Sequence, residues 1–161
     1  MTDPVFYLLC GVPGSGKSTW VSSQPWDTKT TVVVSSDAVI ERWAAQQHTT
    51  YSEIFDRAIG PAVAQMQSEF SAAVAKNLSV VWDQTNLTVK SRRSRLAQVP
   101  QHYRRVAVWF PTPPADLLTQ RLAARPGKII PAKVLQTMIA TAVQPQISEG
   151  FDQVRVVQTH V

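Results

Sequence analysis

The chain has 161 residues, of which 44% are hydrophobic and 17% are charged, and its formal net charge is +5 at pH 7. These values are typical of one globular domain with a sizeable hydrophobic core, and they exclude a disordered polypeptide. No apolar run approaches the roughly 20 residues that a membrane span requires, and the N-terminus lacks the basic start of a signal peptide.

The single cysteine, Cys10, excludes an internal disulfide and a zinc site built from several cysteines. Cys10 ends an apolar run, so we expect it to be a small, buried hydrophobic side chain. Without a membrane span, a signal peptide or a disulfide, the sequence predicts a soluble protein of a reducing, cytoplasmic compartment.

The charge is distributed unevenly along the chain. Residues 1–89 contain five Lys/Arg and eight Asp/Glu, whereas residues 90–161 contain eleven Lys/Arg and three Asp/Glu. A basic second half is typical of a surface that binds polyanions such as nucleic acids. A solvated basic face without a partner has the same composition, so charge alone leaves both interpretations open.

Apolar runs of strand length alternate with helical patterns along the chain. The predicted strands, rich in β-branched and aromatic residues, cover residues 5–10, 31–35, 78–82, 105–110 and 153–157. The predicted helices cover residues 17–23, 37–47, 51–77, 89–98, 114–123 and 131–142. We expect Gly60-Pro61 to break or bend the third helix. The alternation predicts a single α/β domain over residues 1–161, a three-layer α/β/α sandwich with a five-stranded, mainly parallel sheet.

Residues 11–18 form the most specific local motif. They read Gly-Val-Pro-Gly-Ser-Gly-Lys-Ser, the G-x-x-x-x-G-K-[S/T] spacing of a phosphate-binding loop, and they lie between a predicted strand and a predicted helix. The glycines allow backbone N–H groups to turn toward the phosphates of a nucleotide. The candidate ATP-binding residues are Gly11, Pro13, Gly14, Ser15, Gly16, Lys17, Ser18 and Thr19. A Gly-rich turn that binds no nucleotide is the alternative.

Two residues of this loop have predicted chemical roles. The Lys17 ammonium group would reach the β- and γ-phosphates, and the Ser18 hydroxyl would ligate Mg²⁺. The predicted cofactors are therefore ATP and Mg²⁺.

Two aspartates follow predicted strands at the edge of the sheet where the phosphate loop also lies. Asp83 ends an apolar strand in the Walker-B pattern, whose carboxylate supports Mg²⁺. Asp37 then remains to accept a proton from a hydroxyl that attacks the γ-phosphate. The reverse assignment of the two roles and a helix N-cap role for Asp37 are alternatives.

Residues 121–131 interrupt a helical pattern with Pro-Gly between basic residues. Arg121 and Arg125 are four residues apart, so we expect them to share one face of a helix. A short lid that carries arginines can close over the phosphates, stabilise the transferring phosphoryl group and exclude water. We therefore predict that both arginines bind ATP and that Arg125, with Lys17 and Asp37, is catalytic. A basic turn between two helices is the alternative.

Four motifs occur in one order along the chain. They are the phosphate loop at 11–20, Ser35-Ser36-Asp37, Asp83-Gln84-Thr85-Asn86-Leu87, and the Arg121/Arg125 segment with Ile130-Pro131. In this combination, residues 5–157 resemble the kinase domain of phage-type polynucleotide 5′-hydroxyl kinases, in the adenylate-kinase-like branch of P-loop proteins.

The resemblance implies a P-loop kinase fold and ATP-dependent phosphorylation of the 5′-OH end of DNA or RNA. It also implies a role for each matching residue. Lys17 and Ser18 match the phosphate and metal groups, Asp37 the general base, Arg125 the lid arginine, and Thr85 and Asn86 a loop near the acceptor.

The sequence departs from the family pattern at one position. The family has an arginine three residues after the base, where it helps to hold the acceptor strand, whereas this chain has Ile40. Arg42 lies two residues further on, about 200° around a helix from that position. Arg92 and Arg93 are the other candidates for the acceptor contact.

Two other functions remain open. The missing arginine favours a small-molecule kinase that acts on a nucleoside, sugar or antibiotic hydroxyl, or on the hydroxyl of a modified base. A nucleotide-binding switch or ATPase would need neither a hydroxyl-activating Asp37 nor a lid.

Overall fold

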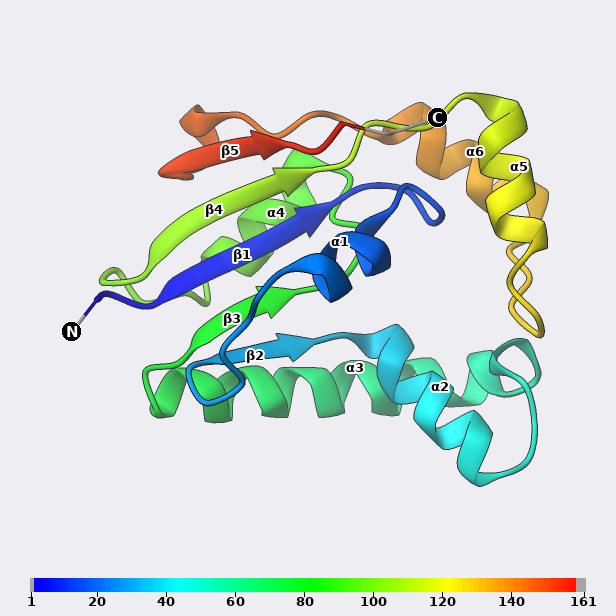
Figure 1. Cartoon of the computed structure of the whole chain (residues 1–161), viewed down its shortest axis with the longest axis horizontal. Coiled ribbons are helices and arrows are strands. Elements are labelled where there is room, and N and C mark those ends of the chain that lie inside the picture. The colour runs from blue at the N-terminus through cyan, green and yellow to red at the C-terminus, as the bar shows by residue number, and fades with distance from the viewer. Residues whose placement is uncertain (1, 159–161) are drawn as a thin grey trace.

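A computed structural model describes residues 2–158 of the chain. Its centre is a five-stranded sheet in the order β2-β3-β1-β4-β5 (Figure 1). All four strand pairings are parallel. The strands are β1 Val5–Cys10, β2 Thr31–Val34, β3 Ser79–Trp82, β4 Arg104–Trp109 and β5 Gln153–Val156.

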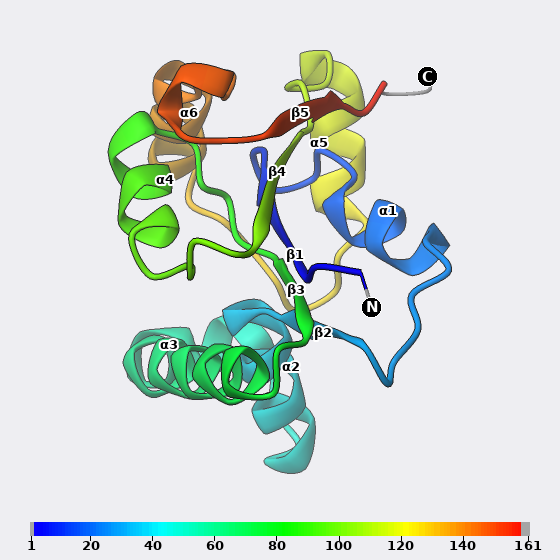
Figure 2. The same cartoon turned by 90° about the vertical axis from the view of Figure 1, so that its left-hand side faces the viewer.

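Within residues 2–158, six α-helices connect or flank these strands. They are α1 Lys17–Ser23, α2 Ser36–Gln46, α3 Tyr51–Ala75, α4 Val89–Leu96, α5 Ala115–Ala123 and α6 Ala132–Thr141. A short 3₁₀ helix, Ile147–Glu149, precedes β5. Seen along the strands, α3, α4 and α6 lie on one side of the sheet and α1 and α5 on the other (Figure 2). The predicted three-layer α/β/α sandwich is confirmed.

Strand β1 lies inside the sheet, with a strand on each edge and an apolar cluster on each face. It pairs with β3 and β4, so Leu8 lies beside Trp82 on one side and Ala107 on the other. Its side chains from Leu8 to Cys10 have no exposed surface. Burial raises the pKa of the Cys10 thiol to about 12, so the cysteine is the buried hydrophobic side chain that was expected.

The predicted break at Gly60-Pro61 is wrong, because α3 is one helix of 25 residues that continues through Pro61. Proline removes a single N–H donor, and Pro61 lies on the exposed side of the helix. On the opposite side, Ala58, Ala62 and Met66 are buried in the core, and this packing keeps the helix continuous across Pro61. Within residues 2–158, no helix is both long and apolar enough to cross a membrane.

The parallel sheet brings the sequence motifs to one edge. The phosphate loop follows β1, Asp37 lies in the first turn of the helix that follows β2, and Asp83 directly follows β3. These three strands are neighbours in the sheet. Because the carboxyl ends of parallel strands meet at the same edge, the three motifs lie together at that edge of the sheet.

Candidate active site at the phosphate loop

The phosphate loop adopts a conformation that requires glycine. Gly14 and Gly16 have φ angles of 81° and 105°, in the left-handed region. A Cβ atom on Gly11 would lie 2.6 Å from the Ser15 hydroxyl oxygen. That hydroxyl is buried and has no hydrogen-bond partner among the described residues. A buried polar group without a partner is expected at a site that receives a polar ligand, so the loop fits a phosphate group.

The Lys17 side chain folds back over the loop. Its Nζ donates hydrogen bonds to the backbone oxygens of Gly11 at 2.8 Å and Val12 at 2.9 Å. Burial lowers the pKa of Lys17 to about 8, against the opposing charges of Asp83 and Asp37. Both aspartates therefore lie close enough to Lys17 for their charges to affect its pKa.

The segment after β3 forms hydrogen bonds with the end of β1 and with the start of the phosphate loop. The backbone oxygen of Thr85 accepts a hydrogen bond of 2.8 Å from the Gly11 N–H. The Asn86 side chain donates to the Leu9 backbone oxygen at 2.8 Å and is only 4% exposed. This burial removes Asn86 from the candidate acceptor contacts, because its amide holds the end of β1 in place. Thr85 is partly exposed.

The two predicted carboxylates differ in their surroundings. Asp83 lies at the carboxyl end of β3, where burial raises its pKa although the charge of Lys17 opposes this shift. Asp37 lies inside the first turn of α2, and the N-cap of that helix is Ser35, whose hydroxyl accepts from the Ala38 N–H. The N-cap alternative for Asp37 is therefore wrong, and its carboxylate is free for other partners.

The Asp37 carboxylate has two partners that the sequence pattern did not identify. The Tyr51 hydroxyl donates to Oδ1 at 2.6 Å, and the Lys128 Nζ donates to Oδ2 at 3.1 Å. Lys128 also donates to Glu41 Oε1 at 3.1 Å. The only signal for Lys128 in the sequence was its position in the basic 121–131 segment. Tyr51 had none, since an aromatic residue at the start of a helix is usually a core residue.

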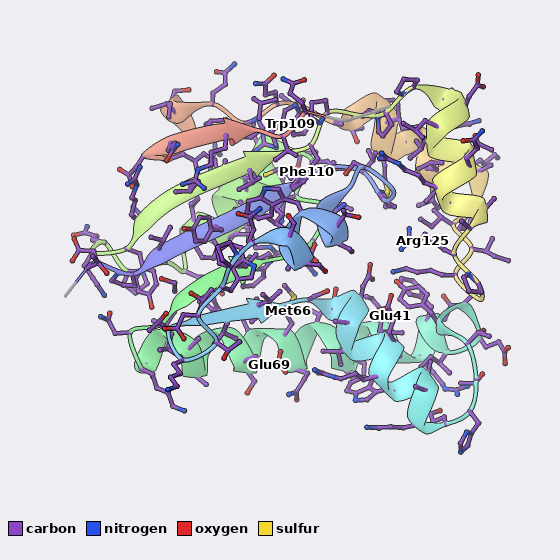
Figure 3. The ribbon with its side chains drawn as sticks, viewed as in Figure 1. Glu41, Met66, Glu69, Trp109, Phe110 and Arg125 are labelled. Carbon is purple, nitrogen blue, oxygen red and sulfur yellow. The ribbon has the colours of Figure 1, made fainter. Side chains whose placement is uncertain are left out.

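The predicted lid arginines lie near the phosphate loop, but not on one helix face. Arg121 belongs to α5, and its Nη1 donates to the Gly14 backbone oxygen at 3.0 Å. Helix α5 ends at Ala123, so Arg125 lies in the turn beyond it, and the shared helix face is wrong. The turn faces Glu41 of α2 (Figure 3). Arg125 lies close enough to Lys17 for its charge to lower the pKa of that lysine.

Arg92 is fully buried and is already bound within the protein. Its guanidinium pairs with both carboxylate oxygens of Glu149, at 2.7 and 3.1 Å. It also donates to the backbone oxygens of Asn86 and Val143, at 3.0 and 2.9 Å. With no exposed surface, Arg92 cannot reach an acceptor, and the expectation that it does so is corrected.

The other candidates for the missing arginine lie away from Asp37. Arg42 pairs with Glu69 of α3 at 3.5 Å, and Glu69 lies along that helix away from Arg125 (Figure 3). Arg93 is exposed on α4 and lines a separate cavity of about 400 Å³ together with Glu149. Ile40 is fully buried between α2 and α3. Position 40 therefore faces the core in this protein.

Ser18 and Asp83 offer the oxygen ligands that a magnesium ion bound with ATP requires. Ser18 is exposed in the first turn of α1, and Asp83 is close enough to Lys17 for its charge to raise the pKa of that lysine. Magnesium in kinase sites takes one or two protein oxygens together with the oxygens of the substrate phosphates. The two residues fit such an ion.

Comparison with known proteins identifies the fold. Similar solved structures include a chain of the Pnkp1/Rnl/Hen1 RNA repair complex (TM-score 0.65, 20% identity, 88% of this chain and 44% of that chain). Others are a sugar kinase from Janibacter sp. HTCC2649 (TM-score 0.60, 20% identity, 96% and 84%) and shikimate kinase from Acinetobacter baumannii (TM-score 0.51, 18% identity, 99% and 86%). At these identities the likeness shows the P-loop kinase-like fold alone.

The chain spans less than half the length of the chain that it matches in the RNA repair complex. No curated protein matches its sequence. A family model does match: the AAA domain designated AAA_33 aligns with residues 6–145. The protein therefore belongs to the AAA_33 family.

Proposed function

We propose that this protein is an ATP-dependent kinase that transfers the γ-phosphate to a hydroxyl group, with Asp37 as the general base. The observation that carries this proposal is the position of the Asp37 carboxylate. It lies near Lys17 of the phosphate loop and is held by Tyr51 and Lys128 on its two oxygens. A water molecule and an acceptor hydroxyl can both use such a base, and the arginine-bearing lid, which would exclude water, favours transfer to a hydroxyl.

The reaction follows from the arrangement of the side chains. The backbone N–H groups of the loop and the Lys17 ammonium would bind the β- and γ-phosphates, and Arg121 and Arg125 would add positive charge beside them. Ser18 and Asp83 would hold Mg²⁺, which neutralises charge on the phosphates when it is bound. The acceptor oxygen forms a bond to the γ-phosphorus, the bond to ADP breaks, and the hydroxyl proton passes to Asp37.

The first candidate acceptor is the 5′-OH end of DNA or RNA. The order of the motifs supports it, as does the excess of Lys/Arg in residues 90–161. Lys90 and Arg93 are exposed on α4, where they are accessible to a phosphodiester backbone. The loss of Arg92 and Asn86 as acceptor contacts weakens this candidate without affecting the kinase chemistry.

A small hydroxyl-bearing molecule is the second candidate, and one observation favours it. Asp37 and Glu41 lie four residues apart on α2, so both carboxylates point to the same side of the helix. Position 40, which carries arginine in the polynucleotide kinases, is buried here. With Lys128 bound to both carboxylates, the group keeps a net negative charge that would repel a nucleic acid backbone, whereas its oxygens can accept hydrogen bonds from the hydroxyls of a sugar or nucleoside.

The test is phosphate transfer from γ-labelled ATP with Mg²⁺ to four acceptor classes: a 5′-OH DNA, a 5′-OH RNA, nucleosides and sugars. A 5′-phosphorylated oligonucleotide is the matched control for the nucleic acids. Transfer to the 5′-OH oligonucleotides alone supports the first candidate, and transfer to small molecules alone supports the second. If ADP forms and no acceptor is labelled, the protein is an ATPase and the proposal is wrong.

The Asp37→Asn variant tests the base directly. Loss of a general base lowers the rate by about 10²–10⁴-fold, and the affinity for ATP should be unchanged because Asp37 is assigned to the acceptor side. Asp116→Asn, at an exposed position of α5, is the matched control. Normal transfer by Asp37→Asn would contradict the assigned mechanism.

A further inference from the structure

The segment that follows α5 is docked on the N-terminus of α3. The Ser52 N–H donates to the Gly127 backbone oxygen at 3.0 Å, and the Ile129 N–H donates to the Ser52 hydroxyl at 2.8 Å. Gly127 has a φ angle of 70°, and a Cβ atom at this position would lie 2.8 Å from Thr50. The contact is therefore close and depends on glycine, and it fixes this segment to the start of α3.

Lys128 lies at the centre of this docked segment. Its Nζ contacts both Asp37 and Glu41 at 3.1 Å and lies 4.4 Å from the centre of the Tyr51 ring. The Lys128 side chain is 10% exposed, whereas those of Asp37 and Glu41 are 51% and 55% exposed. A cation that is this well covered and bound to two carboxylates loses hydration, so its interactions are stronger than those of an exposed pair.

We propose that Lys128 is a positioning residue that orients the base Asp37 only when the lid, residues 121–131, is docked on α3. The inference rests on the proposed kinase function. Tyr51 and Lys128 bind different oxygens of Asp37. Each carboxylate oxygen can accept two hydrogen bonds, so an acceptor hydroxyl can still donate to the oriented group.

The two residues that bind the Asp37 carboxylate belong to different parts of the protein. Tyr51 belongs to α3, which is part of the main body of the protein, whereas Lys128 belongs to the lid. The Asp37 side chain is 51% exposed, and without Lys128 it would be held by the Tyr51 hydroxyl alone. Docking of the lid therefore supplies the second contact that fixes the carboxylate, and the base is ordered when the lid also covers the phosphates. This coupling would limit the transfer of phosphate to water before the lid has docked.

Steady-state kinetics of Lys128→Met, Lys128→Arg and Lys133→Met test the role. Lys133 is an exposed lysine at the start of α6 and is the matched control. For Lys128→Met we expect kcat for the acceptor to fall by about ten- to a hundredfold, with the KM for ATP unchanged. Lys128→Arg should recover part of kcat because it keeps the charge. If Lys128→Met behaves like Lys133→Met, or if its KM for ATP rises as much as kcat falls, the proposal is overturned.

Amide hydrogen exchange gives a second measurement that does not depend on catalysis. In Lys128→Met, the amides of Ser52 and Ile129 should exchange faster than in the wild-type protein and in Lys133→Met, because the lid docks less firmly. Unchanged exchange together with an unchanged kcat would overturn the proposal, because Lys128 would then neither hold the lid nor orient Asp37. If the wild-type protein phosphorylates no hydroxyl, the proposed function fails, while the exchange result still decides whether Lys128 holds the lid to α2.

Discussion

The Tyr51 hydroxyl donates a hydrogen bond of 2.6 Å to Asp37 Oδ1, and so joins the first turn of α3 to the first turn of α2. Burial and the bond to Asp37 raise the pKa of Tyr51 far above its ordinary value. The phenol therefore stays protonated near neutral pH and remains a donor to Asp37. Because α2 and α3 pack against each other through a shared apolar cluster, the position of Asp37 depends on the packing of these two helices.

Tyr51→Phe is expected to lower the rate of acceptor phosphorylation while leaving the aromatic packing intact. A hydrogen bond to a charged group contributes about 1.5–3 kcal/mol, so its loss corresponds to a rate lower by about ten- to a hundredfold. The pH dependence of kcat between pH 6 and 9 should have the same shape in both proteins, because Tyr51 does not titrate there. A new pH dependence of kcat in the variant would contradict the assignment of a permanent proton to the Tyr51 hydroxyl.

Lys17 should make the stability of the unliganded protein depend on pH. Burial lowers its folded-state pKa from 10.5 to about 8, so between these values the unfolded chain binds more protons than the folded protein. The free energy of unfolding therefore rises with pH across this window. Lys17→Met should lack this rise, so the stability of the wild-type protein should increase relative to the variant between pH 8 and 10. Parallel curves in urea unfolding experiments would argue against a shifted lysine.

Two glycine-to-alanine substitutions should have opposite effects on stability. In Gly11→Ala, the new Cβ would lie 2.6 Å from Ser15 Oγ and 2.8 Å from Phe110 Cβ. Overpacking of this kind destabilises by about 1–3 kcal/mol, and ATP affinity should fall because the loop shifts. In Gly60→Ala, nothing lies within 4 Å of the new atom, and the helix should gain about 0.5–1 kcal/mol. Thermal unfolding and nucleotide titration of both variants check this contrast.

Arg92→Met should destabilise the protein strongly. It leaves Glu149 without its partner and removes two hydrogen bonds to the backbone, and breaking a buried ion pair costs about 3–5 kcal/mol. Arg42→Met is the control, because the Arg42–Glu69 pair is exposed and contributes about 0–1 kcal/mol. Similar urea midpoints for the two variants would show that the buried pair does not hold α4 to the segment before β5.

Local sequence was sufficient to predict the sheet, the order of the elements and the phosphate loop. Each predicted strand is present within two residues at each end, because an apolar, β-branched run has few alternatives to a buried parallel strand. The loop was predictable because Gly14 and Gly16 meet a local backbone requirement. The break in α3 was predicted wrongly, because a local propensity was weaker than the packing of buried residues on both sides of Pro61.

The contacts of the charged side chains were decided by the tertiary structure. The sequence suggested that Arg92 lies at the surface. In the structure it is buried and paired with Glu149, 57 residues away. Lys128 contacts Asp37 across 91 residues, and no periodicity in the sequence relates two positions so far apart. Periodicity and turn chemistry act over a few neighbouring residues, whereas the partner of a charge depends on which helices the completed sheet brings together.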